Sequence, residues 1–375
     1  MDSVPARGPR STAAARQVAR PHGKPWPRYE RAALGLRDYW YPALLSRQIK
    51  GKPVSLRMLG EELVFVRREG KVYCLEGRCR HRGVPLSEGR CEFPGTISCA
   101  YHGWTYSLET GSLLAALTDG PDSSIVGKVR LRTYPVVERQ GLIWAFVGDT
   151  EPPPLEADVP EEFLDPRTAV AAQVRVLPGN WRLAMEGSLD SSHAFYLHRS
   201  AWMNAFTQVQ ASKGRYWVDV IDDRYVSYHT DPPAAEWDYP GLGRWPPKPW
   251  WKLRRRAIVK FAAWLPCGAR VQGVVPGTTV YSWYVPVDRD HYRWFQLLVA
   301  QPSGLHRLAF WARYHLWWRW LYQWQFLSQD ARMNELLHPF YAEQEGWDRE
   351  RLHRPDVVLT AWRKFIDKNA RRIQE

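Results

Sequence analysis

The first part of the chain alternates apolar and polar residues with a period of two, which is the pattern of half-buried β-strands. Over residues 38–77 these runs are short, and turns that contain glycine separate them. The turn Arg68-Glu69-Gly70 lies between two such runs and predicts a hairpin, and Gln140-Gly141 predicts another. Residues 36–148 are therefore predicted to form a small all-β domain.

Residues 149–167 break this pattern. From Asp149 to Pro166 the chain has seven acidic residues, five prolines and no lysine or arginine. Proline stiffens the chain, and acidic side chains that repel one another stay in water. We therefore predict a solvated, fairly stiff linker between two domains.

The remaining residues, 168–375, mix strand and helix patterns. Ala169–Leu177 predicts a strand, and the residues from Asn180 to about Ala205 predict a single helix. Further strand patterns follow, and helix patterns close the chain. The predicted strands are 208–230, 257–264, 278–287 and 292–301, and the predicted helices are 305–325, 328–345 and 357–373. An antiparallel sheet with long helices is an α+β arrangement.

The composition indicates a folded protein with an excess of positive charge. Of 375 residues, 45% are hydrophobic and 21 are tryptophan. Lys and Arg number 52 against 39 Asp and Glu, which gives a formal charge of +13. This charge favours anionic partners such as nucleic acid, anionic lipid or an acidic electron-donor protein. No nucleic-acid recognition module is visible, so we expect no nucleic acid among the partners.

Residues 1–35 are predicted to be a basic, disordered arm. Residues 3–29 contain six Lys or Arg and no acid, as a transit peptide would, but their prolines disfavour an amphipathic helix. No run of about 18 apolar residues is present, so no membrane-spanning helix is predicted. Five cysteines, two of which are assigned to a metal centre below, favour a reducing cytoplasm over a disulfide framework.

Two short motifs, Cys79-x-His81 and Cys99-x2-His102, bring together residues that bind metals. A [2Fe–2S] cluster with two Cys on one iron and two His on the other, a Rieske centre, uses this ligand set. The alternative is a Cys2His2 zinc site, which uses the same side chains. The C-x-H spacing is unusual for zinc, and a glycine follows each pair, so that backbone N–H groups can approach an anionic cluster. These features favour the Rieske centre.

A second metal site is predicted on the helix that follows the linker. Asp190-x2-His193-x4-His198 places three potential ligands on one helical segment. His193 and His198 are five residues apart, so both can reach one metal only if the helix is locally irregular. The alternative is that these side chains cap the helix and pack in the core. Next to a redox cluster, a non-haem iron site with two His and one carboxylate is the favoured interpretation.

The carboxylate ligand is predicted to be Asp330. No Asp or Glu occurs between Asp290 and Asp330, so Asp330 is the first acid after the predicted hairpin, and it is expected to begin a new helix. Glu335 is the second candidate for this ligand. A simple N-terminal helix cap is the alternative role for Asp330.

With these motifs, the sequence resembles the terminal oxygenase (α) subunits of Rieske non-haem iron aromatic-ring-hydroxylating oxygenases. The resemblance covers residues from about 36 to 372, and its most specific parts are the Rieske segment, Asp190–His198 and Asp330. It implies an all-β Rieske domain, a helix-grip (START-like) catalytic domain, and head-to-tail homotrimers. It also implies an O2-dependent mono- or dioxygenase that takes electrons from NAD(P)H through a separate reductase or ferredoxin.

The same resemblance implies a role for Asp190. Its carboxylate would bridge His102 of one subunit's cluster to His193 at the neighbour's Fe(II) site, and so carry electrons between subunits. The substrate is expected to be a hydrophobic, polycyclic ring compound. The residues expected to line its pocket, from sequence proximity and strand alternation, are Phe195, Trp202, Phe206, Tyr281, Trp283 and Phe295.

Two basic, tryptophan-rich segments are not explained by this chemistry. Trp245–Lys260 has six basic residues and no acid, and Leu305–Gln325 has five Trp, three Arg and two His. Arginine beside tryptophan suits a membrane interface, packing in the core or the trimer, or a dock for an acidic ferredoxin. Membrane contact would place the protein at the inner membrane surface and favour sterol or terpenoid substrates. The competing class of function is an electron-transfer protein with an inactive second domain.

Overall fold

The computed structural model describes residues 26–202, 207–208, 216–230, 237–239, 243–245, 255–256 and 260–375. Its first domain consists of antiparallel strands in three small sheets, β3-β4-β5-β9, β10-β11-β2 and β6-β7-β8. The strands are β2 (Tyr39–Leu45), β3 (Val54–Met58), β4 (Glu61–Arg68), β5 (Lys71–Glu76), β6 (Thr96–Ser98), β7 (Trp104–Ser107), β8 (Leu113–Ala116), β9 (Thr133–Tyr134), β10 (Val136–Arg139) and β11 (Leu142–Val147).

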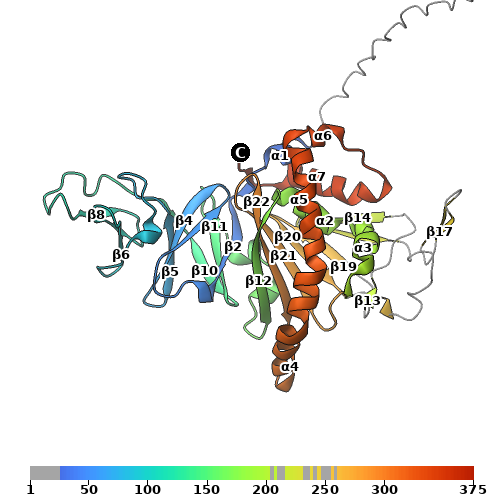
Figure 1. Ribbon diagram of the computed structural model, residues 1–375. Coiled ribbons are helices and arrows are strands. Elements are labelled where there is room, and N and C mark those ends of the chain that lie inside the picture. The colour runs from blue at the N-terminus through green and yellow to red at the C-terminus, as the bar shows by residue number, and fades with distance from the viewer. Residues whose placement is uncertain are drawn as a thin grey trace, which may run out of the picture.

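Both predicted hairpins of this domain are confirmed. Glu69 and Gly70 connect β4 to β5 with φ angles of 51° and 76°, and Gln140 and Gly141 connect β10 to β11 with 51° and 74°. Two successive residues with positive φ form the tight turn whose twist matches that of the paired strands. The sheet β6-β7-β8 lies at the end of the molecule farthest from α3 (Figure 1).

The second domain is built on a seven-stranded antiparallel sheet in the order β12-β22-β21-β20-β19-β15-β14. Its strands are β12 (Ala169–Pro178), β14 (Tyr216–Ile221), β15 (Tyr225–Thr230), β19 (Lys260–Trp264), β20 (Gly268–Gln272), β21 (Thr279–Pro286) and β22 (His291–Ala300). The hairpin predicted at residues 288–290 joins β21 to β22 and is confirmed. Smaller described strands are β13 (Thr207–Gln208), β16 (Trp237–Tyr239), β17 (Gly243–Trp245) and β18 (Arg255–Arg256).

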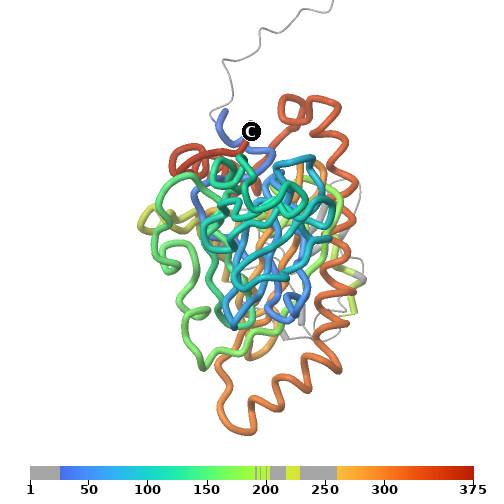
Figure 2. Tube along the Cα trace, turned by 90° about the vertical axis from the view of Figure 1, so that its left-hand side faces the viewer, coloured from blue at the N-terminus to red at the C-terminus, as the bar shows by residue number. Residues whose placement is uncertain are grey.

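One long helical element runs along this sheet (Figures 1 and 2). It consists of α4 (Leu305–Arg313), a π-helical segment (Tyr314–Phe326) and α5 (Leu327–Glu343), with no break between them. The prediction of two separate helices here is wrong. The helices that complete the domain are α2 (Trp181–Leu189), α3 (Ser191–Leu197), α6 (Gly346–Arg349) and α7 (Val357–Asn369).

The predicted helix from Asn180 to Ala205 is interrupted at Asp190. The Asn180 side chain caps the start of α2, and Asp190 has an extended backbone (ψ 96°) between α2 and α3. The Asp190 side chain accepts a hydrogen bond from the Ser192 N–H, as an N-cap residue does. A capping residue stabilises a helix start, so the chain begins a second helix instead of continuing the first.

The two ends of the described chain lie together, which corrects the prediction of a disordered arm over residues 1–35. Residues 26–35 are folded: α1 (Pro27–Arg31) packs against α7, and Tyr29 is fully buried. Next to them, β1 (Leu36–Arg37) pairs with β23 (Arg372–Ile373). Residues 1–25, where most of the basic residues of the predicted arm lie, are outside the described residues.

The segment 149–167 is not simply solvated, in contrast to the prediction. Phe163 is fully buried and packs edge-on against Trp144 of β11 and Trp283 of β21, with ring centroids 5.8 and 5.2 Å apart. Asp158 is buried and forms an ion pair with Arg371 at 2.7 Å. Apolar side chains spaced among the acids thus join the two domains into one continuous core.

Candidate metal centres

Two loops of the same local shape bring the first four candidate ligands together. The N–H of Gly83 donates to the carbonyl of Cys79 at 2.8 Å, and the N–H of Gly103 donates to that of Cys99 at 3.1 Å. Both glycines have positive φ, 73° and 63°, which explains why this position is glycine in each loop. The first loop follows β5 and the second connects β6 to β7.

The four side chains line one small hollow at the tip of the first domain. Cys79 and Cys99 are buried, whereas the rings of His81 and His102 lie 4.6 Å apart nearer the surface. Trp104 stacks on His81 with ring centroids 4.7 Å apart. Two buried sulfurs opposite two accessible imidazoles fit a [2Fe–2S] cluster whose histidine-bound iron faces outward.

The second candidate centre combines residues from segments far apart in the chain. One ligand atom each from His193, His198 and Asp330 lies within 4.8 Å of the others. Asp330 Oδ1 is 3.0 Å from His193 Nε2 and 3.4 Å from His198 Nε2. The helix α3 ends at His198, where ψ is 10°. This is the local irregularity expected for two histidines five residues apart.

The other ring nitrogen of each histidine has its own partner. His193 Nδ1 lies 3.5 Å from Asp190 Oδ2, and His198 Nδ1 lies 2.9 Å from Gln329 Oε1. The His198 ring also stacks on Phe326, with centroids 3.8 Å apart. Both Nε2 atoms therefore point toward Asp330, the arrangement that metal-binding histidines adopt.

The electrostatics of these residues fit a cation. Burial by itself would raise the pKa of Asp330, but hydrogen bonds from His193 and His198 hold it well below its usual range. Burial lowers the pKa of His193, but Asp190 and Asp330 outweigh burial and raise it to about 10. The second carboxylate oxygen, Asp330 Oδ2, is buried and has no hydrogen-bond partner among the described residues. A buried acceptor without a partner is costly unless a cation or water satisfies it.

The two late acids have different surroundings. Asp330 does not cap a helix start, because the helix continues without a break from the π segment into α5. Glu335 pairs with Arg332 at 2.7 Å and does not belong to the cluster.

The predicted pocket lining is wrong for the two strands of the central hairpin. Trp283 packs on Trp144 of the first domain, and Phe295 pairs with Trp283 on the same face of the sheet. It is the next residue, Tyr284, that reaches α2, through the hydroxyl of Ser188. Because side chains alternate between faces, an error of one residue in the strand reverses the face.

The other predicted lining residues are not placed in a pocket either. Tyr281 stacks on Trp283, with ring centroids 5.9 Å apart, on the face toward the first domain. Trp202 is 64% exposed and contacts Trp320. Phe206 and the side chain of Phe195 lie outside the described residues.

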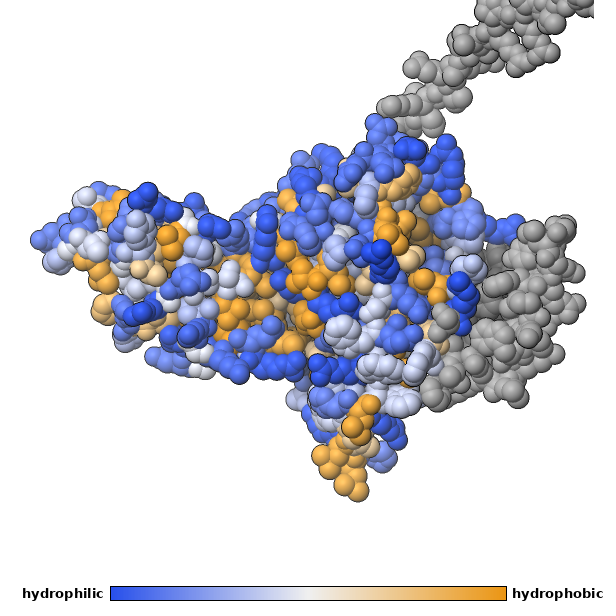
Figure 3. Space-filling view, in the orientation of Figure 1, coloured by the Kyte–Doolittle hydropathy of each residue, from blue (hydrophilic) through white to orange (hydrophobic). Residues whose placement is uncertain are grey.

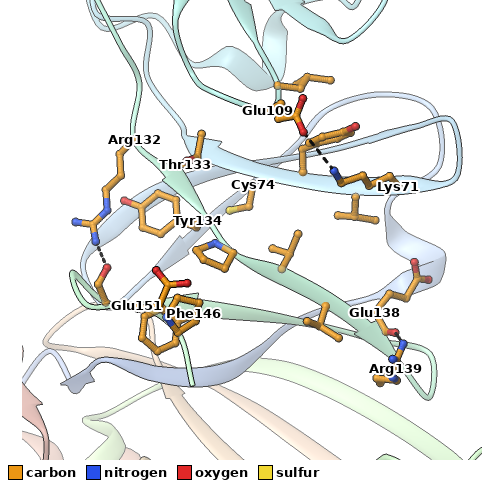
Figure 4. A pocket seen from close by; sticks show the side chains of 18 of the residues that line it. Lys71, Cys74, Glu109, Arg132, Thr133, Tyr134, Glu138, Arg139, Phe146 and Glu151 are labelled. Carbon is orange, nitrogen blue, oxygen red and sulfur yellow. Dashed lines mark hydrogen bonds and ion pairs between the residues drawn. The ribbon is translucent and has the colours of Figure 1, made fainter. Parts of the chain in front are cut away.

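A cavity of about 870 Å³ lies within the first domain, between its sheets (Figure 4). Its walls include Lys71, Cys74, Arg132, Tyr134 and Phe146. None of its lining residues belongs to either candidate metal centre. It is therefore not the place where a substrate would meet the histidine and aspartate cluster.

Comparison with known protein families assigns both domains. Residues 39–135 match the Rieske [2Fe-2S] domain, and residues 146–209 and 243–374 match the homotrimeric ring hydroxylases. The chain belongs to this ring hydroxylase family. It is 34% identical to the carbazole 1,9a-dioxygenase terminal oxygenase component of a Sphingomonas species, over 96% of this chain and 98% of the relative. The corresponding component from Metapseudomonas resinovorans is 32% identical over 94% and 95% of the two chains.

Solved structures of ring hydroxylases have the same fold. The terminal oxygenase of carbazole 1,9a-dioxygenase from Novosphingobium sp. KA1 matches with a TM-score of 0.84 and 32% identity, over 94% of this chain and 97% of that one. A reduced complex between oxygenase and ferredoxin of carbazole 1,9a-dioxygenase also matches with a TM-score of 0.84, over 93% of both chains.

These comparisons confirm the predicted fold and class of function. The chain is the terminal oxygenase component of an O2-dependent ring hydroxylase, with a Rieske [2Fe–2S] cluster and a mononuclear iron. Among the described residues, no helix is long and apolar enough to cross a membrane.

Proposed function

We propose that this ring hydroxylase inserts oxygen into a hydrophobic, polycyclic aromatic compound. In this proposal, Cys79, His81, Cys99 and His102 hold the cluster, and the mononuclear iron binds to His193, His198 and Asp330. The observation that carries the iron site is the convergence of these three side chains around Asp330 Oδ2, a buried oxygen that lacks a hydrogen-bond partner. Carbazole-bound structures of a relative support the substrate class.

When bound, the cluster and the iron supply the reductive activation of O2. The protein's own residues hold and orient these groups. Buried Cys79 and Cys99 keep the sulfur side of the cluster away from water, and Trp104 covers His81. At the iron, Asp190 and Gln329 hold the two rings so that both Nε2 atoms face Asp330.

Asp190 is proposed to carry electrons between subunits. Its Oδ1 accepts hydrogen bonds from the N–H and hydroxyl of Ser192, and its Oδ2 faces His193. The side chain is still 26% exposed, so a second imidazole can reach it from outside. Within one chain the cluster loops and α3 lie at opposite ends of the molecule (Figure 1). A bridge to His102 of a neighbouring subunit in the trimer would close this gap.

The electron donor is proposed to be a ferredoxin or reductase that takes electrons from NAD(P)H. Support comes from the solved complexes of a relative with its ferredoxin. The formal charge of +13 would attract an acidic donor. We propose that the protein works in the cytoplasm.

A second candidate role, hydroxylation of sterol-like lipids at a membrane surface, is favoured by one surface feature. The tip of α4 projects from the body of the molecule and is strongly apolar (Figure 3). Leu305 and Leu308 on this tip are 81% and 68% exposed, with Arg307 between them. Contact with an anionic membrane would bury these leucines beside the basic residue. The other basic segment, Trp245–Lys260, lies mostly outside the described residues.

Iron and acid-labile sulfide analysis of the purified protein tests the iron site. A Rieske cluster plus one mononuclear iron predicts about three iron and two sulfide per chain. Replacing both His193 and His198 with Ala should reduce this to about two iron and two sulfide, with an unchanged Rieske spectrum and no turnover. Two iron in the wild-type protein, with full occupancy of the cluster, would instead indicate an electron carrier.

A further inference from the structure

His198 is held from three sides by a single turn of the long helix. Phe326 stacks on its ring, Gln329 lies 2.9 Å from its Nδ1, and Asp330 Oδ1 lies 3.4 Å from its Nε2. Residues three and four positions apart share one face of a helix, so this turn presents all three groups to the same ring. His198 itself is 1% exposed, so bulk water does not compete for its nitrogens.

The partner of Nδ1 decides which nitrogen of a neutral imidazole can bind a metal. When Nδ1 carries the proton and donates it to an acceptor, the lone pair lies on Nε2. With the proton on Nε2, the nitrogen that faces Asp330 could not be a ligand. Gln329 presents its carbonyl oxygen to Nδ1, so an Nδ1–H can donate to it while the lone pair of Nε2 faces the iron site.

We propose that Gln329 is a positioning residue of the iron site, which holds His198 in its Nδ1-protonated tautomer and fixes the orientation of the ring. This inference rests on the proposed function, since it requires that His198 binds the iron through Nε2. Gln329 is not itself a ligand and acts on the iron through His198. Outer partners of this kind typically contribute about 10–100-fold to metal affinity.

The two histidines are then held in chemically different ways. His193 faces the Asp190 carboxylate, whereas His198 faces the neutral amide of Gln329. A carboxylate partner increases the basicity of an imidazole more than an amide does. His193 is therefore the stronger of the two donors, and it is the one that shares its partner Asp190 with the proposed electron path. Gln329 fixes the orientation of the His198 ring without adding charge to a buried site.

The test uses the full-length protein with its Rieske cluster intact and its mononuclear site emptied by a chelator. Fe(II) is titrated anaerobically into wild type, Gln329→Leu, Gln329→Glu and Gln325→Leu. Gln325 is the matched control, because it is a glutamine on the same helix that accepts a backbone hydrogen bond, from Trp202, at 3.1 Å. We expect Fe(II) to bind about 10–100-fold more weakly to Gln329→Leu. Gln329→Glu keeps an acceptor and should bind at least as tightly as wild type, because a carboxylate makes the imidazole a stronger donor. Gln325→Leu should bind as wild type does.

Unchanged Fe(II) affinity in Gln329→Leu would overturn the inference. Wild-type affinity in His198→Ala would instead overturn the proposed iron site, so the two failures are distinguishable.

Discussion

At the scale of single residues, a hydrogen bond between a buried tyrosine and a cluster cysteine can be removed by mutation. The Tyr106 hydroxyl is buried and lies 3.3 Å from Cys79 Sγ, and it accepts a hydrogen bond from the Arg80 N–H at 3.2 Å. Burial and the neighbouring Cys79 hold the pKa of Tyr106 far above its usual range, so the hydroxyl keeps its proton. Because a ligating thiolate can only accept, the Tyr106 O–H donates to the sulfur. A hydrogen bond to a cluster sulfur stabilises the more negative, reduced state.

Replacing Tyr106 with Phe should therefore lower the reduction potential of the cluster. If the lost bond favours the reduced state by about 1 kcal/mol, the potential falls by roughly 40 mV. A spectroscopic redox titration measures this shift. Tyr101→Phe is the control, because Tyr101 is 57% exposed and contacts His102 through its ring. Equal potentials for the Tyr106 variant and wild type would contradict a hydrogen bond to the sulfur.

At the scale of elements, the long helix carries the exposed apolar tip at one end and Asp330 of the metal site farther along. Its π-helical segment, residues 314–326, ends at Phe326, the first residue of the turn that contacts His198. Wide turns of this kind occur often at functional sites. Within the segment, buried Gln323 donates to the carbonyl of Gln296 on β22 and accepts from the Tyr314 hydroxyl. The bond to Gln296 attaches the helix to the sheet seven residues before Asp330.

The exposed end of this helix provides the test of membrane contact. We expect the wild-type protein to co-sediment with anionic liposomes at low salt, and much less with zwitterionic ones. Exchanging Leu305 and Leu308 for Ser should reduce the bound fraction at least about tenfold, since burial of each leucine contributes about 1.5–3 kcal/mol. Leu336→Ser, which changes a leucine that is 53% exposed on α5, is the control. Absence of binding to anionic liposomes at low salt would exclude membrane contact.

At the scale of the whole molecule, the proposed electron path makes each iron site depend on a neighbouring chain. One variant, His102→Ala, would lack an intact cluster but keep Asp190 and its iron site. The other, Asp190→Ala, would keep its cluster but lose the bridge. Each variant alone should have little turnover.

Co-expression of the two variants should restore part of the activity. In mixed trimers, the intact cluster of one chain lies beside the intact Asp190 of another, so electrons can cross at that junction. Product formation by the mixture, compared with the two homotrimers at equal protein concentration, measures this. The cluster spectrum of Asp190→Ala should match the wild type. A mixture no more active than its components would contradict transfer between subunits.

Much of the chemistry could be read from the sequence because its ligands are close in the chain. Four cluster residues lie within 24 positions, and the spacing itself sets which side chains can meet in a short loop. Asp190, His193 and His198 likewise belong to one segment. Asp330 was identifiable because a long stretch without acids precedes it. The comparisons confirm the class of oxygenase, while the roles of these individual residues stay predictions.

Other features depend on how distant segments meet, and there the sequence was insufficient. The sequence assigned Trp283 to the pocket lining, whereas it is Tyr284 that faces α2. Alternation along a strand shows which residues share a face of the sheet, but not which face packs against α2. Gln329 was overlooked for a similar reason, since its meaning comes only from the position of His198, 131 residues earlier. The sequence by itself determined the kinds of metal centre, through local spacing. The tertiary structure decided which nitrogens face the iron site and what holds them, because those contacts arise only when the helix that carries Asp330 packs beside α3.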